Sequence, residues 1–521
     1  MRAKVNKNAI KILAACIAVL AVFTAGFGFV LMPAGALFAE GPADGTKAFS
    51  SEGNIGSRYY RIPALLTAQD GTLIAAMDAR FGGTADSPNN LDTAVSTSTD
   101  NGATWTDRLA FSFADWESAS PSLLPDGSLR ILNSASVIDP SLLQDGQTGR
   151  VFMLVDAFPY ATGFSSSQTG SGYTEVDGEK RLMLRKNGEE NYDYTVRGDG
   201  AIYDKNGQKT AYSLNSRGEI LENGTPLTIT QKRQHYWYTV PFATGTGQDV
   251  PMHIFYRDAL FQAYPTSYLY LMWSDDNGRT WSDPVDLNAQ VKSDDAGFTG
   301  VCPGRGIQIK NGAHAGRLIF PVYSADPETG DQFFSVIYSD DHGATWAAGE
   351  PVTLNETVGA CMSETQLVQF ADGSLQAFSR TQAGFVGTAY SADGGATWQD
   401  AQLIDELPLA AGSGCQLSAI NYAGKIDGKD AVLLSAPAGD GRTNGFIYVG
   451  LIEENAGRYS INWTYKTEVT DANTYFAYSC LTQLSDGSVG LLYEQSNVAQ
   501  SVDTTLFKTF TVTELTASAV Q

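Results

Sequence analysis

Three arginines carry positive charge into apolar parts of the chain. Arg61 lies within an apolar segment, Arg380 ends an apolar strand, and Arg442 follows an apolar run in a glycine-rich loop. Arginine is rarely buried without an anionic partner, so each of them alone is explained by a structural ion pair. Three arginines in matching settings, in a chain with a net charge of −23, instead favour a cluster that grips a carboxylate.

Three further residues are able to move protons or form a covalent bond. A tyrosine at the start of a strand, such as Tyr478, usually only packs, but a nearby carboxylate such as Glu364 could take its proton and make it a nucleophile. Asp86 lies in the polar loop 82–90, where an aspartate usually forms a turn. A carboxyl group in such a loop is also suited to protonate a departing oxygen.

A repeated turn motif indicates how the chain positions these residues. The pattern Ser-x-Asp-x-Gly-x-Thr-Trp, which we call the Asp-box, occurs at 98–105, 274–281, 339–346 and 391–398. Aspartate and glycine form the tight turn of a hairpin, and we expect the tryptophan to pack the turn against its own sheet. A short motif that recurs in this way is typical of repeat architectures.

The spacing of the Asp-boxes predicts an all-β chain folded as a six-bladed β-propeller. The final tryptophans of successive copies are separated by 176, 65 and 52 residues. The two shorter gaps each suit one four-stranded blade. The longest gap holds two blades and a surplus of short polar hairpins, which predicts a small inserted β-domain. The predicted organisation is a signal segment (1–39), propeller (40–162), insert (163–234) and the rest of the propeller (235–521).

A second repeat predicts which residues meet. Apolar strands flank Asp-Gly turns at 70–71, 126–127, 372–373 and 486–487. Arg61 lies nine residues before its turn, and Glu364 and Tyr478 each lie eight residues before theirs. Equivalent positions in successive blades occupy equivalent places around a propeller, so these three residues are expected at one rim of the central channel.

Charge and the N-terminal sequence restrict partners and location. The net charge of −23 and the pI near 4.5 argue against nucleic acid and anionic membranes as partners. Arg2, Lys4, Lys7 and Lys11 precede an uncharged stretch at 12–39. This pattern predicts a signal peptide and a secreted or cell-surface protein, with an uncleaved membrane anchor as the alternative.

The cysteines and histidines do not predict a metal site. The cysteines after the signal segment are widely spaced, and so are the histidines. They are Cys302, Cys361, Cys415 and Cys480, and His235, His253, His314 and His342. Buried free thiols are the favoured interpretation, one disulfide is the alternative, and no metal or cofactor is expected.

Taken together, these motifs resemble the bacterial exo-α-sialidases (neuraminidases) of the larger type, which carry an inserted β-domain. The resemblance rests on YRIP around Arg61, DAR ending at Arg80 with Asp86 six residues later, SETQ around Glu364, and YSCL around Tyr478. The Asp-boxes, also called BNR repeats, add to it. The resemblance covers the chain from about 45 to 510.

This resemblance implies a role for each site residue. Arg61, Arg380 and Arg442 would bind the carboxylate of sialic acid, with Arg305 as a competing candidate for the third position. Tyr478 would be the nucleophile, Glu364 the group that activates it, and Asp86 the acid/base. Arg80 would contact the 4-hydroxyl side of the sugar, and Asp139 would share that pocket.

Three functions are compatible with these residues. The first is a secreted, retaining exo-α-sialidase that hydrolyses terminal sialic acids from glycoproteins, glycolipids or oligosaccharides. The second is the same site with another product. Some relatives form an anhydro-sugar by intramolecular trans-sialidase chemistry, and others eliminate to an unsaturated sugar. The third is a non-catalytic sialic-acid-binding propeller, which the presence of Tyr478, Glu364 and Asp86 disfavours.

Overall fold

The computed structural model describes most of the chain after residue 44. It describes residues 45–520 except 51–54, 58, 82–83, 114–119, 124–128, 133, 232–233, 236–242, 245–247 and 497–503. Gly45–Gln521 forms one compact unit. The predicted signal segment and the Asp-Gly turn at 126–127 lie outside the described residues. Among the residues that are described, no helix has the length and apolar character needed to cross a membrane.

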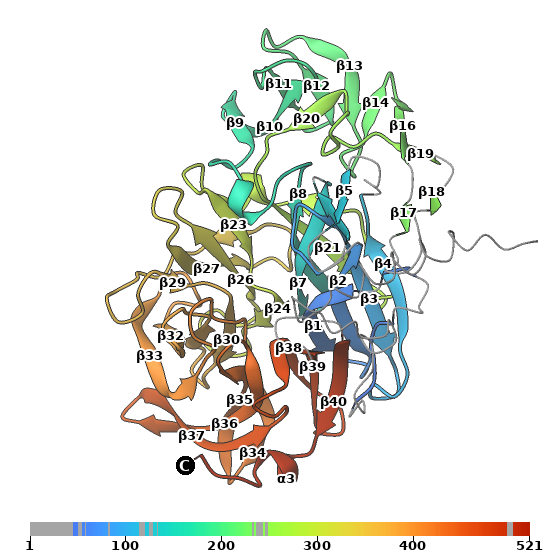
Figure 1. The fold of residues 1–521 in the computed structure, drawn as a ribbon. Helices are drawn as coiled ribbons and strands as arrows, with labels where there is room; N and C mark the ends of the chain where they lie inside the picture. The colour runs from blue at the N-terminus through green and yellow to red at the C-terminus, as the bar shows by residue number, and fades with distance from the viewer. Residues whose placement is uncertain are drawn as a thin grey trace, which may run out of the picture. The chain divides into compact units, whose positions relative to one another are not determined.

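The prediction of an all-β chain is confirmed, and most strands belong to sheets of antiparallel neighbours (Figure 1). The first sheet contains β1 (Tyr59–Thr67), β2 (Leu73–Phe81), β3 (Asn90–Ser98) and β4 (Thr106–Phe111). The next contains β22 (Val285–Asp286), β21 (Tyr268–Ser274), β8 (Val151–Phe158), β7 (Ser136–Gln144) and β24 (Gly304–Arg305). β5 (Ser120–Leu123) and β6 (Leu129–Leu132) form a separate pair.

The second half of the chain forms three further sheets. One contains β23 (Phe298–Val301), β25 (Ile307–Gln308), β26 (Leu318–Ala325), β27 (Gln332–Ser339), β28 (Ala347–Ala348) and β29 (Cys361–Met362). Another contains β30 (Thr365–Gln369), β31 (Leu375–Ser379), β32 (Phe385–Ser391) and β33 (Gln399–Pro408). The last contains β34 (Ser418–Ile426), β35 (Lys429–Gly439), β36 (Thr443–Asn455), β37 (Arg458–Glu468), β38 (Tyr475–Gln483), β39 (Val489–Ser496) and β40 (Thr504–Phe510).

A separate eight-stranded sheet contains the polar hairpins of the long gap between the first two Asp-boxes. Its strands are β9 (Tyr173–Val176), β10 (Glu179–Lys186), β11 (Tyr194–Val196), β12 (Ala201–Tyr203), β13 (Lys209–Leu214), β14 (Ile220–Glu222), β15 (Thr225–Pro226) and β20 (Phe261–Ala263). Two small pairs lie between β15 and β20 in sequence: β16 (Thr228–Gln231) with β19 (Gln248–Pro251), and β17 (Gln234–His235) with β18 (Ala243–Thr244). Because β20 pairs with β10, this sheet uses residues beyond 234.

The helices of the described residues are single turns. They are η1 (Phe164–Ser166), α2 (Asn288–Val291) and α3 (Val512–Leu515). The Thr511 hydroxyl accepts from the Glu514 N–H, and the Glu514 carboxylate accepts from the Thr511 N–H in return, which caps the start of α3.

The innermost strands of the large sheets form a closed ring. β1 contacts both β7 and β38, and contacts continue from β7 to β26, β30, β34 and back to β38. β1 and β38 are almost fully buried along their length, whereas the outer strand β37 alternates between exposed and covered positions. Strands covered on both faces require continuous apolar sequence, and strands covered on one face require alternation. Figure 1 shows β1, β24 and β38 together near the centre.

The Asp-Gly turns hold three of these inner strands in the same register. In each turn the aspartate carboxylate accepts from the backbone N–H two residues later, at 2.9 Å from Thr72, 3.0 Å from Ser374 and 2.9 Å from Ser488. The glycines at 71, 373 and 487 have φ near +90°, a conformation that favours glycine. These matching turns set equivalent positions on β1, β30 and β38.

The Asp-boxes share one hydrogen-bond pattern. In the first copy Ser98 Oγ donates to Asp100 at 2.8 Å and accepts from Gly102 N–H at 2.9 Å, and Thr104 Oγ1 donates to Asp100 at 2.6 Å. The same three contacts occur in the other copies.

The Asp-box tryptophans also contact neighbouring sheets, in addition to the packing against their own sheet that the sequence predicts. Trp105 contacts Phe507 of β40, and Trp398 contacts Phe334 of β27, both on a neighbouring sheet. Trp346 contacts Phe320 of its own sheet and Phe152 of the neighbouring one. These tryptophans therefore join neighbouring sheets.

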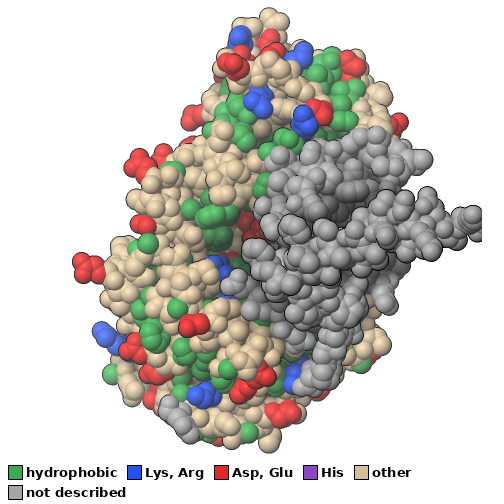
Figure 2. Space-filling model, viewed as in Figure 1, with side chains coloured by type: hydrophobic (Ala, Val, Ile, Leu, Met, Phe, Trp, Pro, Cys, Tyr) green, Lys and Arg blue, Asp and Glu red, His purple; other side chains and the backbone are tan. Residues whose placement is uncertain are grey.

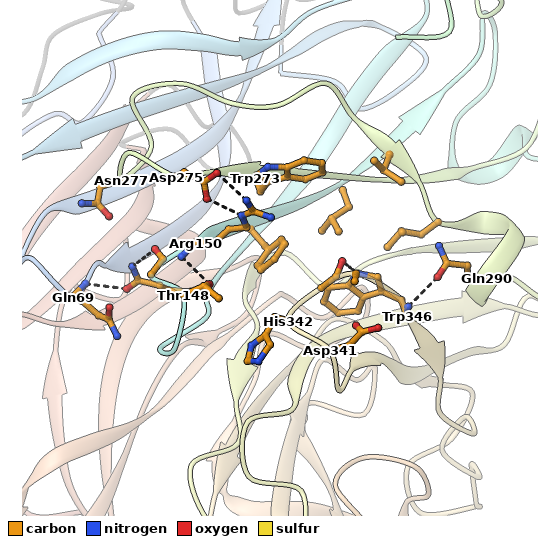
Figure 3. A pocket seen from close by; sticks show the side chains of 18 of the residues that line it. Gln69, Thr148, Arg150, Trp273, Asp275, Asn277, Gln290, Asp341, His342 and Trp346 are labelled. Atoms are coloured by element: carbon orange, nitrogen blue, oxygen red, sulfur yellow. Dashed lines mark hydrogen bonds and ion pairs between the residues drawn. The ribbon is translucent and has the colours of Figure 1, made fainter. Parts of the chain in front are cut away.

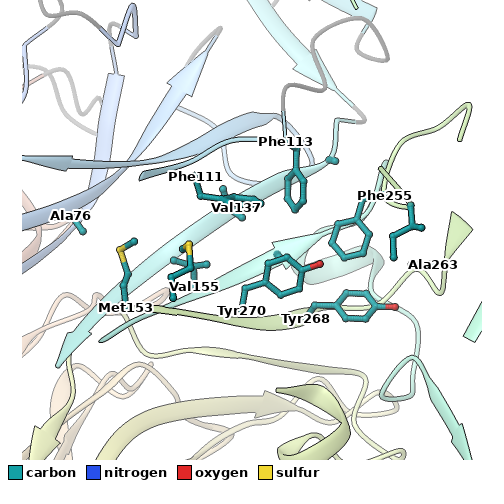
Figure 4. Packing of buried hydrophobic residues seen from close by; sticks show 14 of the residues in the cluster. Ala76, Phe111, Phe113, Val137, Met153, Val155, Phe255, Ala263, Tyr268 and Tyr270 are labelled. Carbon is teal, nitrogen blue, oxygen red and sulfur yellow. The ribbon is translucent and has the colours of Figure 1, made fainter. Parts of the chain in front are cut away.

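The largest apolar cluster joins the first two sheets to the separate eight-stranded sheet. It includes Val137, Met153 and Tyr270 from the second sheet and Phe111 from the first (Figure 4). Phe255 and Ala263, which precede or form β20, pack at its other end. The eight-stranded sheet therefore shares a core with the ring.

Candidate active site

Tyr478 and Glu364 meet at the start of their strands, as the register of the Asp-Gly turns predicts. Tyr478 lies in β38, and Glu364 lies one residue before β30. The Tyr478 hydroxyl donates a hydrogen bond of 2.5 Å to Glu364 Oε1, and both side chains are buried. Burial, followed by the Glu364 charge, raises the pKa of Tyr478 well above its usual value. The phenol is therefore protonated at neutral pH, with a carboxylate already placed to accept its proton.

Arg380 joins this pair from the end of the neighbouring strand β31. Its NH1 group donates to Glu364 Oε2 at 2.6 Å and to the Tyr478 hydroxyl oxygen at 2.9 Å. Its Nε and NH2 groups donate to the carbonyl oxygen of Ser413 at 3.0 and 2.6 Å. These contacts fix the guanidinium beside the phenol oxygen.

Arg61 lies against the face of the Tyr478 ring, with its guanidinium carbon 5.5 Å from the ring centroid. Its Nε and NH2 groups donate to the two oxygens of Glu494 at 3.1 and 3.3 Å. The fully buried Glu494 also accepts from the Ile62 N–H at 2.8 Å. A bidentate contact of this kind sets both the place and the orientation of the guanidinium.

Glu494 is a site residue that was not predicted from the sequence. It follows the apolar first part of strand β39, VGLLYEQS, and is the acidic residue of that strand. A carboxylate inside an apolar strand requires a cationic partner, and that signal could have identified it.

Arg442 is the third arginine beside Tyr478, again 5.5 Å from the ring centroid. It lies in a turn with φ of +62°, and its Nε donates to the carbonyl oxygen of Gly414 at 3.1 Å. Within the described part of the chain, no carboxylate lies at ion-pair distance from it. Its charge is thus the least neutralised of the three.

Arg305, the competing candidate, lies elsewhere. Its NH1 group donates to the carbonyl oxygen of Leu481 at 3.4 Å, three residues along β38 from Tyr478. Three residues of extended strand span roughly 10 Å. The structure therefore brings Arg61, Arg380 and Arg442 around Tyr478.

Asp86 lies on the other side of Arg61. Its carboxylate accepts from Arg80 NH1 at 2.6 Å and lies 3.6 Å from Arg61 NH1, with 66% of the side chain exposed. Partial burial would raise the pKa of Asp86, but the charges of Arg80 and Arg61 outweigh it and lower the pKa below its usual value. The carboxyl is therefore ionised in the unliganded protein.

A buried aspartate that sequence reasoning missed connects Arg80 with Asp139. Asp78 Oδ2 accepts from Arg80 NH2 at 2.7 Å, and its Oδ1 accepts from the Asp139 N–H at 3.0 Å. Asp139 has a φ of +63°, which that hydrogen bond helps to hold. Burial, together with the neighbouring carboxylates of Asp78 and Asp156, raises the pKa of Asp139 well above its usual value. The raised pKa favours the protonated form of this carboxyl, which can donate a hydrogen bond.

Aromatic side chains form one wall of the site. Tyr323 is close enough for the charges of Glu364 and Asp139 to raise its pKa, after the larger effect of burial. Phe298 packs on Tyr323 with ring centroids 5.2 Å apart, and Phe164 packs on Phe298 at 4.8 Å. Phe164 remains 44% exposed.

The exposed Phe164 is adjacent to the loop that carries Asp86. A Cβ added at Gly163 would overlap the carbonyl oxygen of Ser87, so the two loops touch through their backbones. Figure 2 shows hydrophobic and basic side chains gathered at a hollow on the face viewed.

The described residues contain no group of three or more histidine, cysteine, aspartate or glutamate side chains that could hold a metal ion. The favoured interpretation of the cysteines is confirmed, because Cys302, Cys361, Cys415 and Cys480 are buried free thiols. Burial raises the pKa of Cys415 and of Cys480 to about 11, so neither is a ready nucleophile.

Comparison with known proteins assigns this arrangement to a family. Residues 216–491 match the BNR repeat-like domain. The chain is 39% identical over 481 residues to an anhydrosialidase of Macrobdella decora, covering 89% of this chain and 62% of that protein. It is 34% identical over 479 residues to sialidase B of Streptococcus pneumoniae, covering 87% of this chain and 66% of that protein. The chain thus spans somewhat less than two thirds of the length of these relatives.

The chain matches one solved structure over almost the whole of that structure. The intramolecular trans-sialidase from Ruminococcus gnavus, in complex with oseltamivir carboxylate, is 38% identical and superposes with a TM-score of 0.82. The match covers 91% of this chain and 99% of that one.

Proposed function

The chain belongs to the sialidase family, and from that premise we propose that it is a retaining exo-α-sialidase acting on terminal sialic acids of glycoproteins, glycolipids or oligosaccharides. The observation that carries the proposal is the 2.5 Å hydrogen bond from Tyr478 to Glu364, surrounded by Arg61, Arg380 and Arg442. A neutral nucleophile with three nearby cations suits a substrate that carries a carboxylate at the reacting carbon.

Substrate capture follows from the charges. The carboxylate of a sialic acid would bind among the three guanidinium groups, and Arg442 offers the charge with the fewest competing anions. Such binding places the anomeric carbon near the Tyr478 oxygen and neutralises the substrate charge as the oxocarbenium-like transition state forms. An aspartate or glutamate nucleophile would instead meet the substrate carboxylate with a like charge. Sialidases with a tyrosine nucleophile are known exceptions to the two-carboxylate scheme of glycosidases.

The proposed first step forms a bond from the Tyr478 oxygen to the anomeric carbon while the bond to the leaving oxygen breaks. The phenol proton passes to Glu364, and Asp86 protonates the leaving oxygen. In the second step water attacks the anomeric carbon and gives a proton to Asp86. The Tyr478 oxygen departs and recovers its proton from Glu364, so the configuration at the anomeric carbon is retained.

Substrate binding also prepares Asp86 for its proposed role. In the unliganded protein, Arg80 and Arg61 keep the pKa of this carboxyl low. A substrate carboxylate on Arg61 would cancel part of that positive field, so the pKa of Asp86 would rise as the substrate binds. A proton would then be available where the leaving oxygen departs.

A second outcome of the same site is favoured by two relatives, whose names specify an anhydrosialidase and an intramolecular trans-sialidase. In that reaction a hydroxyl of the sugar's own glycerol chain attacks the anomeric carbon in place of water. The first step and all named residues are unchanged, and the product is lighter by one water.

Incubation with sialyl-lactose tests both outcomes. Mass spectrometry of the released sugar separates hydrolysis from loss of one water, and NMR separates an anhydro-sugar from an unsaturated one. Binding of sialyl-lactose without release of any sugar would contradict the enzymatic proposal and support a binding propeller.

The contacts between the innermost strands also support a more detailed propeller fold. We propose six blades with β1, β7, β26, β30, β34 and β38 innermost. The seven-stranded sheet would divide before β38, because β36 and β38 join through one residue pair, Thr443 and Tyr475. The sheet of β9 to β15 would be the inserted β-domain, extended to include β20.

A further inference from the structure

A second cavity, of about 890 Å³, lies at the opposite ends of the strands from Tyr478. It opens between two Asp-box turns, 274–281 and 339–346 (Figure 3). Arg61 lies near the start of β1, whereas Gln69 lies two residues beyond its end and lines this cavity. Eight residues of extended strand span roughly 26 Å, so the cavity is separate from the candidate active site.

The base of the cavity is apolar. Phe152, Leu271 and Leu287 are buried there, and Trp273 beside them is half-buried. Val285 in the wall is 41% exposed and, with Phe164, is one of the two large hydrophobic side chains exposed among the described residues. Apolar surface exposed inside a concave site is typical of a place where a ligand binds.

The charges around the cavity exclude an anionic ligand. Arg150 donates to the two oxygens of Asp275 at 2.7 and 2.9 Å, and its guanidinium lies 5.2 Å from the Trp273 ring centroid (Figure 3). Its charge is therefore already neutralised. His342 pairs with Asp145 at 2.9 Å. Among the described residues that line the cavity, no cation is left for a carboxylate or a phosphate.

The rim instead offers hydrogen-bond acceptors. Asp70, Asp275 and Asp341 all line the cavity. Each carboxylate has about four acceptor positions, and their protein partners occupy only part of these. Such a rim suits a ligand with several hydroxyl donors, and the apolar base suits a ligand with a face of C–H groups. A neutral pyranose has both the hydroxyl donors and the C–H face. Sialic acid also carries a carboxylate, which the carboxylates of the rim would repel.

We propose that this cavity is a second carbohydrate-binding site, which takes a neutral pyranose with one face against Val285 and against the part of Trp273 that Arg150 does not cover. Its hydroxyl groups donate to the carboxylates of the rim. The proposal rests on the proposed function only for the source of the sugar, since removal of a terminal sialic acid exposes a neutral sugar of the same glycan. A second contact of this kind would hold the protein on a branched or clustered glycan.

Saturation-transfer NMR of the full chain with lactose tests this site. We expect a saturable signal that is lost in Val285→Arg, whose exposed position makes the substitution compatible with folding, and in Trp273→Ala. The matched control is Phe164→Ala, at the other exposed hydrophobic residue, which removes any lactose contact beside the candidate active site and should keep the saturable signal of the cavity. Both cavity variants should release sugar from a small soluble sialoside at the wild-type rate.

Three results would overturn the proposal: no saturable lactose signal, a signal that persists in Val285→Arg, or a signal that is lost only in Phe164→Ala. Lactose binding does not depend on turnover. Failure of the proposed sialidase activity would therefore leave this measurement intact and be recognised separately.

Discussion

Arg80 donates a 2.6 Å hydrogen bond to Asp86, so the carboxyl proposed to protonate the leaving group is held as an anion before substrate binds. The same arginine is anchored by Asp78 at 2.7 Å, and both of those side chains are almost fully buried. Asp86 is thus held by a buried ion pair of Arg80 and Asp78, while most of its own side-chain surface faces solvent.

We expect Asp86→Asn to slow the release of sugar in a way that depends on the leaving group. A sialoside of a good aryl leaving group needs little protonation, so its turnover should fall only slightly in its first step. Cleavage of sialyl-lactose should fall by roughly 10²–10⁴-fold. The values of kcat/KM for both substrates, which report the first step alone, check this, and an equal loss of kcat/KM on both would contradict the role of Asp86 as the acid.

Tyr478→Phe should remove turnover while leaving binding largely intact. The phenylalanine ring keeps its packing between Arg61 and Arg442 and lacks only the oxygen that attacks the anomeric carbon. Turnover should fall by roughly 10³-fold or more, whereas the Kd for a sialic acid analogue, measured by calorimetry, should change little. Turnover near that of the wild type would refute the assignment of the nucleophile.

Paired variants separate the two candidates for the third arginine. Arg442→Met should raise KM by roughly 10- to 100-fold, because a charge-assisted hydrogen bond is worth about 1.5–3 kcal/mol. Arg305→Met should lower the melting temperature without changing KM, since its side chain bonds to the backbone of β38. A rise in KM in Arg305→Met alone would instead assign the third carboxylate-binding position to Arg305.

Phe164→Ala should alter the preference for the group attached to sialic acid. Its exposed ring lies beside the Asp86 loop, where the leaving group must depart. Loss of stacking worth about 0.5–1.5 kcal/mol corresponds to a roughly two- to tenfold rise in KM for a sialylated oligosaccharide. A small sialoside that does not reach the ring serves as the control substrate and should be unaffected.

The buried His253 should make the fold sensitive to acid. Burial lowers the pKa of its imidazole from 6.5 to about 3, and its Nδ1 accepts from the Phe255 N–H at 3.0 Å. The folded state therefore binds this proton less readily than the unfolded state does. The stability that depends on neutral His253 is complete above pH 6.5 and is lost as the pH falls toward about 3.

His253→Asn tests this because an asparagine oxygen can accept the same N–H without taking up a proton. We expect the free energy of unfolding to fall less steeply between pH 6.5 and 4, by up to about 1.4 kcal/mol per pH unit, in the variant. Denaturant titrations across that range measure the slope. Identical slopes in the two proteins would contradict a neutral buried imidazole.

The residues at the centre of the site could be predicted from local sequence because the chain contains repeated hairpins. The Asp-Gly turns recur with a constant offset, so the register of one hairpin predicts that of the next, and Tyr478 and Glu364 could be paired without a structure. Glu494 and Asp78 were missed for a physical reason. Each is one acidic residue in an apolar strand, and its partner is chosen by packing between strands, which local patterns do not encode.

The contacts of the Asp-box tryptophans with neighbouring sheets were not predicted for a related reason. Turn chemistry fixes the hydrogen bonds inside the motif, whereas the direction of the tryptophan depends on the sheet next to it. The extent of the eight-stranded sheet was also hidden, because the three residues of β20 are too few to form a recognisable pattern.

The contacts of Phe507 have a further consequence for the lifetime of the folded chain. This residue of β40 forms a β-bridge with Thr46 near the first described residues and makes an edge-to-face contact with Trp105 of the first Asp-box. A Cβ at Gly102 would overlap the Phe507 ring, so the ring packs directly against the glycine. Strand β40 thus joins the first sheet to the sheet that contains β38, and we expect the ring of sheets to open first at this seam. We expect the rate of proteolysis to be set by slow opening at this seam. The seam should open before the residues around Tyr478 become exposed.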